Sequence, residues 1–428
     1  LWNLGEVECG DPDVLTGVLR VWGNAEEVHL NHNRFEHVTL GARIQAGDNQ
    51  TIKKVVLRDN YIVHADQGAF QVSDRRRARS NREQGRLIEA QVLRNRIQDT
   101  SFRTARGRYS PAIEVQCALH AHLAGNVINR VGSQGLDIYG GKLNGEDGEW
   151  PFSRQVVHQN HVVDSMMISS DWAGIELWQG GPFYVFNNNS GAPHGMLSWK
   201  GKEGARFGFP FYHDGAFKSY TFNNIAWART DNESEKYGSK AAFQTVLSFE
   251  INYFNNSIYN FRYGWHRQSP GGANDAYLGN IVQDISLSAM EHAKPAKNQD
   301  AVNITHFKAA EDADYFTNAY ARNVFWDTPT IGTYIIEGKE HDSLEGFQID
   351  LERFGYTGGQ PVGIMADSAP MPGAAEGDFR PAKGSGVDLG GIKHFAPWAL
   401  YAVVGEWNFT PNNKEPDLIV DEHWYMTE

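Results

Sequence analysis

Three short apolar segments each carry one carboxylate between two branched side chains, an arrangement that can support acid/base chemistry. The segments are Ile113-Glu114-Val115, Leu136-Asp137-Ile138 and Ile175-Glu176-Leu177. If all three occupy the same position of a repeated unit, the carboxylates come together on one face. Carboxylates packed that closely repel each other and their pKa values move apart, which can create a general acid and a general base from like residues. The pattern therefore predicts a catalytic cluster of Glu114, Asp137 and Glu176.

A recurring asparagine marks the repeated unit. Asn126 follows Glu114 by twelve residues, and Asn188 follows Glu176 by the same interval. The full series is Asn33, Asn60, Asn95, Asn126, Asn160, Asn188, Asn224, Asn256, Asn280 and Asn323. The segments between these markers alternate over short runs, as strands do. Asparagine tolerates the left-handed backbone of a sharp corner, and its amide can hydrogen-bond to the next repeat. The series therefore predicts an all-β solenoid.

This pattern resembles the right-handed parallel β-helix of the pectate-lyase-like superfamily. The resemblance covers residues 1–335 and implies one solenoid domain with long loop insertions on one face. We expect N-terminal coils or a cap to be missing, and residues 336–428 to form a closing coil and a C-terminal extension. The 44 Gly and 12% aromatic residues are typical of a loop-rich β protein. A β-propeller, the main alternative, requires a tighter period.

Aligning the repeats on their asparagines places uncharged amides on both sides of the acids. The aligned positions are Gln45, Gln71, Glu114, Asp137, Glu176 and, further along, Gln244. Neighbouring coils lie about 4.8 Å apart, so carboxyls on adjacent coils approach the separation of a retaining glycosidase, and those two coils apart that of an inverting one. The alternative is an exposed acidic strand face without a catalytic role.

Aromatic and polar residues near the acids predict a sugar-binding surface. Trp172 and Trp178 flank Glu176, and Tyr139 follows Asp137. Because side chains alternate along a strand, Trp178 and Tyr139 share the face of the carboxylates. We expect His213 to orient the substrate or carry a proton. Further expected substrate contacts are Gln71, Lys200, Asp214 and His266. Packing aromatics and structural histidines are the alternative interpretation.

An arginine-rich stretch indicates the substrate's charge. Residues 74–108 contain eleven Arg and four acidic residues, although the chain has a net charge of −13. Arginine forms planar, bidentate contacts with sulfate or carboxylate groups. The predicted anion-binding residues are Arg75, Arg77, Arg106 and Arg108. Fold-stabilising ion pairs are the alternative. Nucleic acid is disfavoured because the net charge repels phosphates, and no apolar run is long enough to predict a membrane span.

These features favour a secreted or periplasmic glycoside hydrolase, monomeric and without a cofactor, that cleaves an anionic and preferably sulfated polysaccharide. Its clustered acids are similar in logic to those of the β-helical polygalacturonases, although the Gly-x-Gly-His signature of those enzymes is absent. The architecture resembles that of the β-helical endo-fucanases.

Two other functions stay open at the level of sequence. One is a Ca²⁺-dependent polysaccharide lyase, in which the three acids bind calcium and Lys200, Arg206 or His213 abstracts a proton. The other is a β-helix that binds glycans without cleaving them. A calcium requirement and an unsaturated product distinguish the lyase from the hydrolase.

Overall fold

Parallel β-strands dominate the part of the chain that the structure describes. The computed structural model describes residues 17–47, 49–74, 85–103, 110–140, 153–195, 206–229, 240–268, 274–292, 318–333, 339–353 and 360–382. The chain divides into two compact units, Leu1–Tyr184 with Ser190–Tyr212 (unit 1) and Val185–Asn189 with His213–Glu428 (unit 2). The fold is a parallel β-helix, as the sequence predicts. Most of the expected loop insertions fall outside the described residues.

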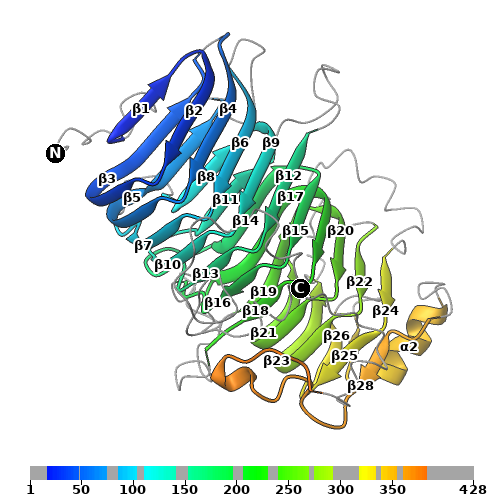
Figure 1. Cartoon of the computed structure of the whole chain (residues 1–428). Helices are drawn as coiled ribbons and strands as arrows, with labels where there is room; N and C mark the ends of the chain where they lie inside the picture. The colour runs from blue at the N-terminus through cyan, green and yellow to red at the C-terminus, as the bar shows by residue number, and fades with distance from the viewer. Residues whose placement is uncertain are drawn as a thin grey trace, which may run out of the picture. The chain divides into compact units, whose positions relative to one another are not determined.

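Unit 1 repeats a coil of three strand positions, and in its first coils the second and third positions are merged into one long strand. Its strands are β1 (Leu19–Trp22), β2 (Ala25–Asn31), β3 (Arg34–Gln45), β4 (Thr51–Arg58), β5 (Tyr61–Ser73), β6 (Arg86–Leu93), β7 (Arg96–Thr100), β8 (Ile113–Gln116), β9 (Ala118–Ala124), β10 (Val127–Val131), β11 (Leu136–Tyr139), β12 (Arg154–His158), β13 (His161–Val163) and β14 (Trp172–Gly180). In successive coils β9 pairs with β12, β10 with β13 and β11 with β14 (Figure 1). Each coil therefore repeats the strand positions of the coil before it.

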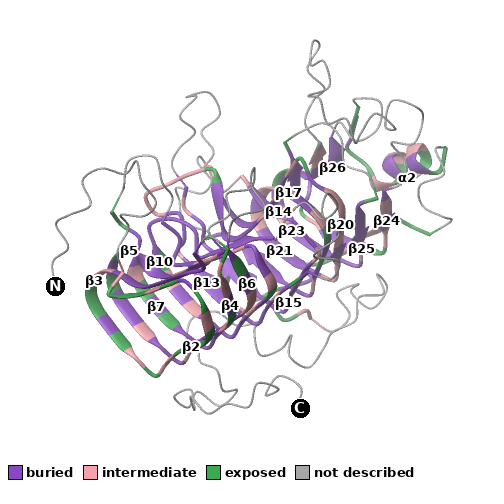
Figure 2. Ribbon diagram, turned by 90° about the horizontal axis from the view of Figure 1, so that it is seen from above, coloured by how far each residue is buried: buried purple, intermediate pink, exposed green. Residues whose placement is uncertain are grey.

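Apolar side chains of successive coils stack inside the helix. Ile113 pairs with Leu136, and Leu136 with Ile175, and all three side chains are fully buried. Burial alternates along β8, so that Glu114 and Gln116 face outward while Ile113 and Val115 face the core. Figure 2 shows buried and more exposed residues alternating along strands of this unit. This alternation follows from the two-residue period of a strand. It places the carboxylate position of each coil on the outside.

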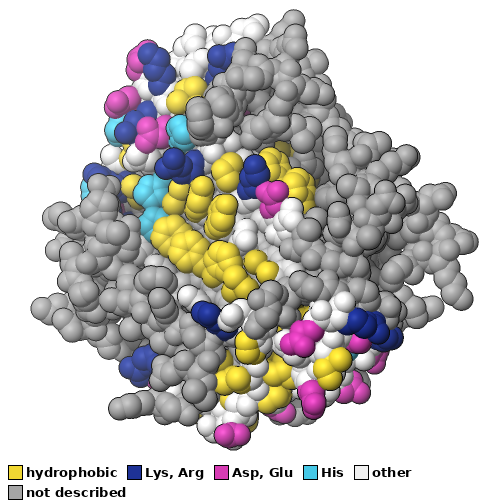
Figure 3. All heavy atoms as spheres, turned by 90° about the vertical axis from the view of Figure 1, so that its right-hand side faces the viewer, with side chains coloured by type: hydrophobic (Ala, Val, Ile, Leu, Met, Phe, Trp, Pro, Cys, Tyr) yellow, Lys and Arg dark blue, Asp and Glu magenta, His cyan; other side chains and the backbone are white. Residues whose placement is uncertain are grey.

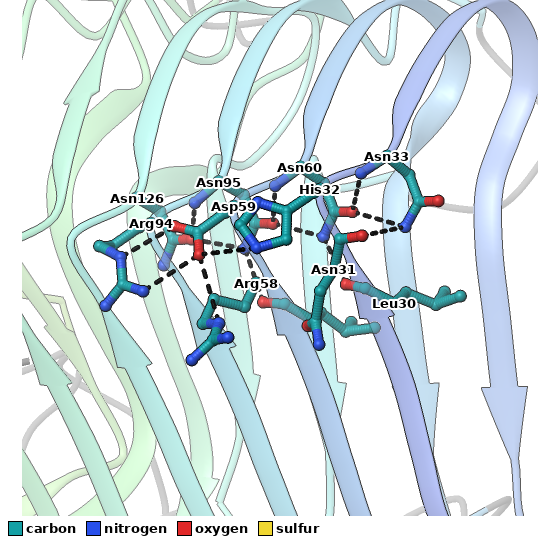
Figure 4. A network of polar contacts seen from close by, with 11 residues as sticks. Leu30, Asn31, His32, Asn33, Arg58, Asp59, Asn60, Arg94, Asn95 and Asn126 are labelled. Carbon is teal, nitrogen blue, oxygen red and sulfur yellow. Dashed lines mark hydrogen bonds and ion pairs between the residues drawn. The ribbon is translucent and has the colours of Figure 1, made fainter. Parts of the chain in front are cut away.

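The predicted asparagine series forms a buried hydrogen-bonded ladder at one corner of unit 1 (Figure 4). Each Nδ2 donates to the Oδ1 of the next asparagine over 2.9–3.0 Å, in the order Asn33, Asn60, Asn95, Asn126 and Asn160. The same Oδ1 atoms accept backbone N–H groups of the preceding asparagines. The ladder satisfies polar groups that burial would otherwise leave unpaired, and thereby fixes where each coil turns.

The left-handed backbone expected of these asparagines belongs instead to the residue before each one. The φ angles are 58° at His32, 57° at Asp59 and 53° at Arg94, just ahead of Asn33, Asn60 and Asn95. The bend is completed one residue earlier, so the asparagine itself can direct its amide along the stack. Arg94 and Asp59 also form a buried ion pair at this corner, with Nε and Oδ1 2.8 Å apart.

Unit 2 continues the strand pattern and contains a ladder of its own. β15 (Phe183–Phe186), β16 (Asn189–Gly191) and β17 (Gly208–Phe222) include residues of both units. The other strands are β18 (Ile225–Trp227), β19 (Ala241–Val246), β20 (Phe249–Phe254), β21 (Ser257–Arg267), β22 (Ala276–Leu278), β23 (Ile281–His292), β24 (Ala319–Ala321), β25 (Asn323–Trp326), β26 (Thr330–Thr333), β27 (Glu340–His341) and β28 (Gly363–Met365). The second ladder joins Asn188, Asn224, Asn256, Asn280 and Asn323 at 3.0 Å per step.

The described residues beyond 335 include two helices and a further strand pairing. They are the α-helix α2 (Leu344–Arg353) and the 3-10 helix η3 (Ala374–Glu376), while β28 pairs in parallel with β25. Phe379 is fully buried against the rings of Trp227 and Tyr259. The domain boundary at residue 335 stays a prediction. Among the helices in the described part of the chain, none has the length and apolar character required to cross a membrane.

Candidate active site

The three predicted carboxylates are neighbours on one face of unit 1. Asp137 on β11 pairs with Glu114 on β8 at one side and with Glu176 on β14 at the other. Gln71 on β5 pairs with Glu114 and continues the column. The alignment of Gln71, Glu114, Asp137 and Glu176 is therefore confirmed, and parallel strands separate successive members by about 4.8 Å.

Exposure falls along this carboxylate column. Glu114 is half-buried, whereas the exposed fraction is 5% for Asp137 and 0% for Glu176. Of the three carboxylates, only Glu114 is therefore accessible from outside, and the cluster does not line an open cleft along its whole length. Burial raises the pKa of Asp137 well above its usual range, and the nearby charge of Glu114 raises it further. The Oδ1 atom of Asp137 is buried without a hydrogen-bond partner, which also favours the neutral form.

Polar and aromatic side chains accompany the carboxylates two residues further along each strand. Gln116 donates a hydrogen bond from Nε2 to Oε1 of Glu114. Tyr139 pairs with Trp178, and their ring centroids are 4.7 Å apart. Trp172 contacts Trp178 edge-on at 5.7 Å, and the Tyr139 hydroxyl donates to Oε1 of Gln179 over 2.9 Å. Trp178 is the most accessible of the three rings, because Tyr139 and Trp172 are each only 7% exposed.

The structure corrects the column at its N-terminal end. Gln71 pairs with Arg43 and not with Gln45, which pairs with Ser73. Arg43 in turn pairs with Arg20 on β1. Gln45 keeps its predicted face because it lies two residues beyond Arg43. Beyond Glu114, the column therefore continues with the amide of Gln71 and then with Arg43 and Arg20. The sequence alignment identified neither arginine.

His213 and Asp214 lie on β17 and belong to unit 2. The His213 side chain is fully buried, with Nε2 3.0 Å from Thr221 Oγ1 and 3.1 Å from Ser219 Oγ. Burial lowers the pKa of His213 to about 3. Because its imidazole is neutral and lies in the interior, His213 fits a structural role and is not part of the candidate site. Asp214 is half-buried.

His266 lies on β21 of unit 2, in a column of side chains that pair across neighbouring strands. It pairs with Gln244 and Glu291, and its Nδ1 is 2.7 Å from Gln244 Oε1. Its Nε2 is 3.9 Å from Glu291 Oε2. The sequence did not predict the pairing of Gln244 with His266, and the place of Gln244 in the carboxylate column stays a prediction. The contact of His266 with substrate stays a prediction.

The arginine-rich stretch is only partly described. Arg75, Arg77, Arg106 and Arg108, together with Lys200, lie outside the described residues. Within the stretch, Arg94 forms the buried pair with Asp59, and Arg103 lies 3.8 Å from Asp66. Both contacts fit the ion-pair alternative, while the anion-binding role of the other arginines stays a prediction.

Half-buried rings form a further outward column in unit 2 that the sequence analysis missed. Phe222 pairs with Phe254, and Phe254 with Leu278. Phe186 stacks on Phe222 with a centroid distance of 4.9 Å. Each of these residues lies two positions before a ladder asparagine, a recurrence that the sequence could have revealed. Apolar side chains also form a continuous patch on the surface in Figure 3.

Unit 2 also contains a hollow lined by acidic residues at one corner. A cavity of about 450 Å³ is bordered by Asn260, Asp284, Ile285, Ser286, Asp327, Thr328 and Pro329. Burial raises the pKa of Asp284, and the Asp327 carboxylate adds to this effect. Asn260, Asp284 and Asp327 all have a positive φ. In the described part of the chain, no group of three or more His, Cys, Asp or Glu is arranged to bind a metal ion.

Comparison with known proteins adds no assignment. No protein-family model matches the chain, and neither the curated proteins nor the solved structures include a match. The class of protein therefore rests on the fold, a parallel β-helix, and on the geometry of the carboxylate column.

Proposed function

We propose that this protein is a glycoside hydrolase that cleaves an anionic polysaccharide on the outer face of unit 1. The observation that carries the proposal is the register of Glu114, Asp137 and Glu176, which brings three carboxylates together on consecutive coils. Such a grouping is electrostatically unfavourable, and unfavourable groupings of titratable residues are common at catalytic sites.

The two catalytic roles follow from the different environments of Asp137 and Glu114. Asp137 has a raised pKa and keeps its proton to a higher pH, so it is the general acid that protonates the leaving oxygen. Glu114 is more accessible and accepts a hydrogen bond from Gln116, which suits an ionised nucleophile. The strand spacing of about 4.8 Å is close to the carboxyl separation of roughly 5–5.5 Å in retaining enzymes. Glu176 lies on the other side of Asp137 in the column, one strand further from Glu114.

The aromatic residues provide the binding surface for the sugar. Trp178 is half-buried and lies on the same face as Glu176, next to Tyr139. An apolar ring face of this kind contacts the C–H face of a sugar. An enzyme of this class acts on polymers outside the cell, so secretion or a periplasmic location belongs to the same proposal.

The test is a screen of sulfated, uronic and neutral polysaccharides with two simultaneous readouts. Reducing ends without absorbance from an unsaturated product support the hydrolase. An unsaturated product that requires calcium would show a lyase instead, and binding without either product would show a glycan-binding protein. The proposal fails if no polysaccharide in the panel yields new reducing ends while the folded protein binds one of them.

A further inference from the structure

The outer face of unit 1 carries two parallel columns of side chains that extend well beyond the carboxylates. In register, the first column runs Arg20, Arg43, Gln71, Glu114, Asp137 and Glu176. The second column lies two residues further along each strand and runs Trp22, Gln45, Ser73, Gln116, Tyr139 and Trp178. Both columns share one face because strand side chains alternate. The face therefore changes from cationic at β1 and β3 to acidic at β11 and β14.

The cationic end has the components of an anion subsite. Arg20 is exposed, and its Cζ lies 5.1 Å from the centroid of the Trp22 ring. Arg43 pairs with it on the next strand and is 8% exposed. Two guanidinium groups on adjacent strands can contact one sulfate or carboxylate group, or two successive ones, with bidentate geometry.

Gln45 provides an independent indication of a ligand at this end. Its side chain is 4% exposed, and its Oε1 atom is buried without a hydrogen-bond partner. A buried amide oxygen without a donor is unfavourable by about 1–3 kcal/mol, and native structures keep few of them. Gln45 pairs with Trp22 on one side and with Ser73 on the other, so the atom belongs to the second column, beside Arg43. A hydroxyl group of a bound sugar would supply the missing donor.

We propose that β1 and β3 form a distal subsite for an anionic group of the polysaccharide, with Arg20 and Arg43 as its cations. This inference rests on the proposed function and adds the direction in which the substrate lies. Arg43 is three strand steps from Asp137 and Arg20 is four, or about 14 and 19 Å. The substrate runs along the column, with its neutral glycosidic bond at Glu114 and Asp137 and an anionic substituent a few sugar residues away. The acidic end repels such a substituent and thereby sets the register of the chain.

The experiment measures binding in an Asp137→Asn background, so that turnover does not interfere. The probes are fucoidan, chemically desulfated fucoidan and polygalacturonate, and the readout is the dissociation constant by calorimetry at low and at physiological salt. The variants are Arg20→Gln, Trp22→Ala and Arg43→Gln. Arg154→Gln is the matched control, because Arg154 is exposed but lies on β12, in a different sheet.

We expect Arg20→Gln and Arg43→Gln to weaken binding of the preferred anionic probe roughly 10-fold each, the usual effect of losing a hydrogen bond to a charged group. Arg154→Gln should have no effect. Fucoidan as the sensitive probe identifies a sulfate subsite, and polygalacturonate identifies a carboxylate subsite. Added salt should reduce the difference between parent and variant.

The subsite would be overturned if Arg20→Gln and Trp22→Ala bind the anionic probe as tightly as Arg154→Gln and the Asp137→Asn background do. Because Arg20 and Trp22 are exposed, these two variants keep the test valid if Arg43→Gln does not fold. The proposed function is separately tested by turnover of the parent. Reducing-end release combined with unchanged binding in the arginine variants would remove only the subsite, whereas arginine-dependent binding without any cleavage would remove only the hydrolase.

Discussion

Replacement of Asn95 tests whether the asparagine ladder holds the coils of unit 1 together. The Asn95 side chain makes four buried hydrogen bonds. Its Nδ2 donates to Leu57 O and to Asn126 Oδ1, both over 2.9 Å. Its Oδ1 accepts from the backbone N–H and the Nδ2 of Asn60, over 3.1 and 2.9 Å. Asn95→Ala therefore removes the side-chain partner of the Leu57 carbonyl and of the Asn60 backbone N–H. Asn60 Nδ2 loses one acceptor but keeps Leu30 O, and Asn126 Oδ1 keeps the backbone N–H of residue 95.

The expected loss of stability follows from that count. Each buried polar group left unpaired costs about 1–3 kcal/mol, so the two groups that lose their partner predict that Asn95→Ala lowers the free energy of unfolding by about 2–6 kcal/mol. Asn95→Asp keeps the size of the side chain but replaces Nδ2 with an oxygen that faces two hydrogen-bond acceptors, Leu57 O and Asn126 Oδ1. It should be at least as destabilising at neutral pH. Asn33→Ala is the control, since Asn33 is only half-buried at the end of the ladder and water can replace its contacts.

Urea unfolding followed by tryptophan fluorescence measures the change in stability. Hydrogen exchange of the Asn60 amide gives a local readout, because that N–H donates to Asn95 Oδ1 and should lose protection in the variant. The reasoning is wrong if Asn95→Ala and Asn33→Ala lower the stability by the same small amount, under about 1 kcal/mol, with the Asn60 amide still protected.

Three further predictions concern the carboxylate column. Because the folded-state pKa of Asp137 is raised, the native state binds an extra proton above the ordinary carboxyl pKa, and stability falls as the pH rises from there to the folded pKa, by at most about 1.4 kcal/mol per pH unit. Asp137→Asn should therefore become more stable relative to the parent as the pH rises from 4 to 7 in thermal melts, and a pH-independent difference would contradict the raised pKa. Trp178→Ala should raise KM up to about 10-fold with little change in kcat, since a ring contact contributes about 0.5–1.5 kcal/mol, and an unchanged KM would show that the ring does not touch substrate. NMR of the first product should show retention of anomeric configuration, as expected for carboxylates on adjacent strands, whereas inversion would move the second role from Glu114 to a more distant base.

The asparagine series could be predicted from sequence because each ladder residue occupies one fixed point of its coil. Its amide must reach the coils on both sides, and no other side chain has the same donor and acceptor in that geometry. The strands around Glu114, Asp137 and Glu176 were identified for a similar reason, since apolar residues on either side of an acid define which side chain faces out. The face of Gln45 was correct even though its register was wrong, because Gln45 and Arg43 differ by two positions.

The remaining site features depend on distances that the sequence does not contain. The turn between the carboxylate face and the next asparagine varies in length, so counting back from Asn60 could not select Arg43 over Gln45. The burial of His213 arises from its direction on β17, where it points inward towards Ser219 and Thr221. A polar residue in an apolar strand gives no sign of which way it faces when the interior itself contains hydrogen-bond partners.

The turnover of Asp137→Asn measured against the parent tests the central claim most directly. The substrate is the polysaccharide that the parent cleaves, and the fold of the variant is checked by circular dichroism. Loss of a general acid predicts that kcat falls by at least about 10²-fold while binding persists, because the amide keeps the shape of the side chain but cannot donate a proton to the leaving oxygen. A variant with near-parental kcat would show that the carboxylate column is a structural feature and not the active site.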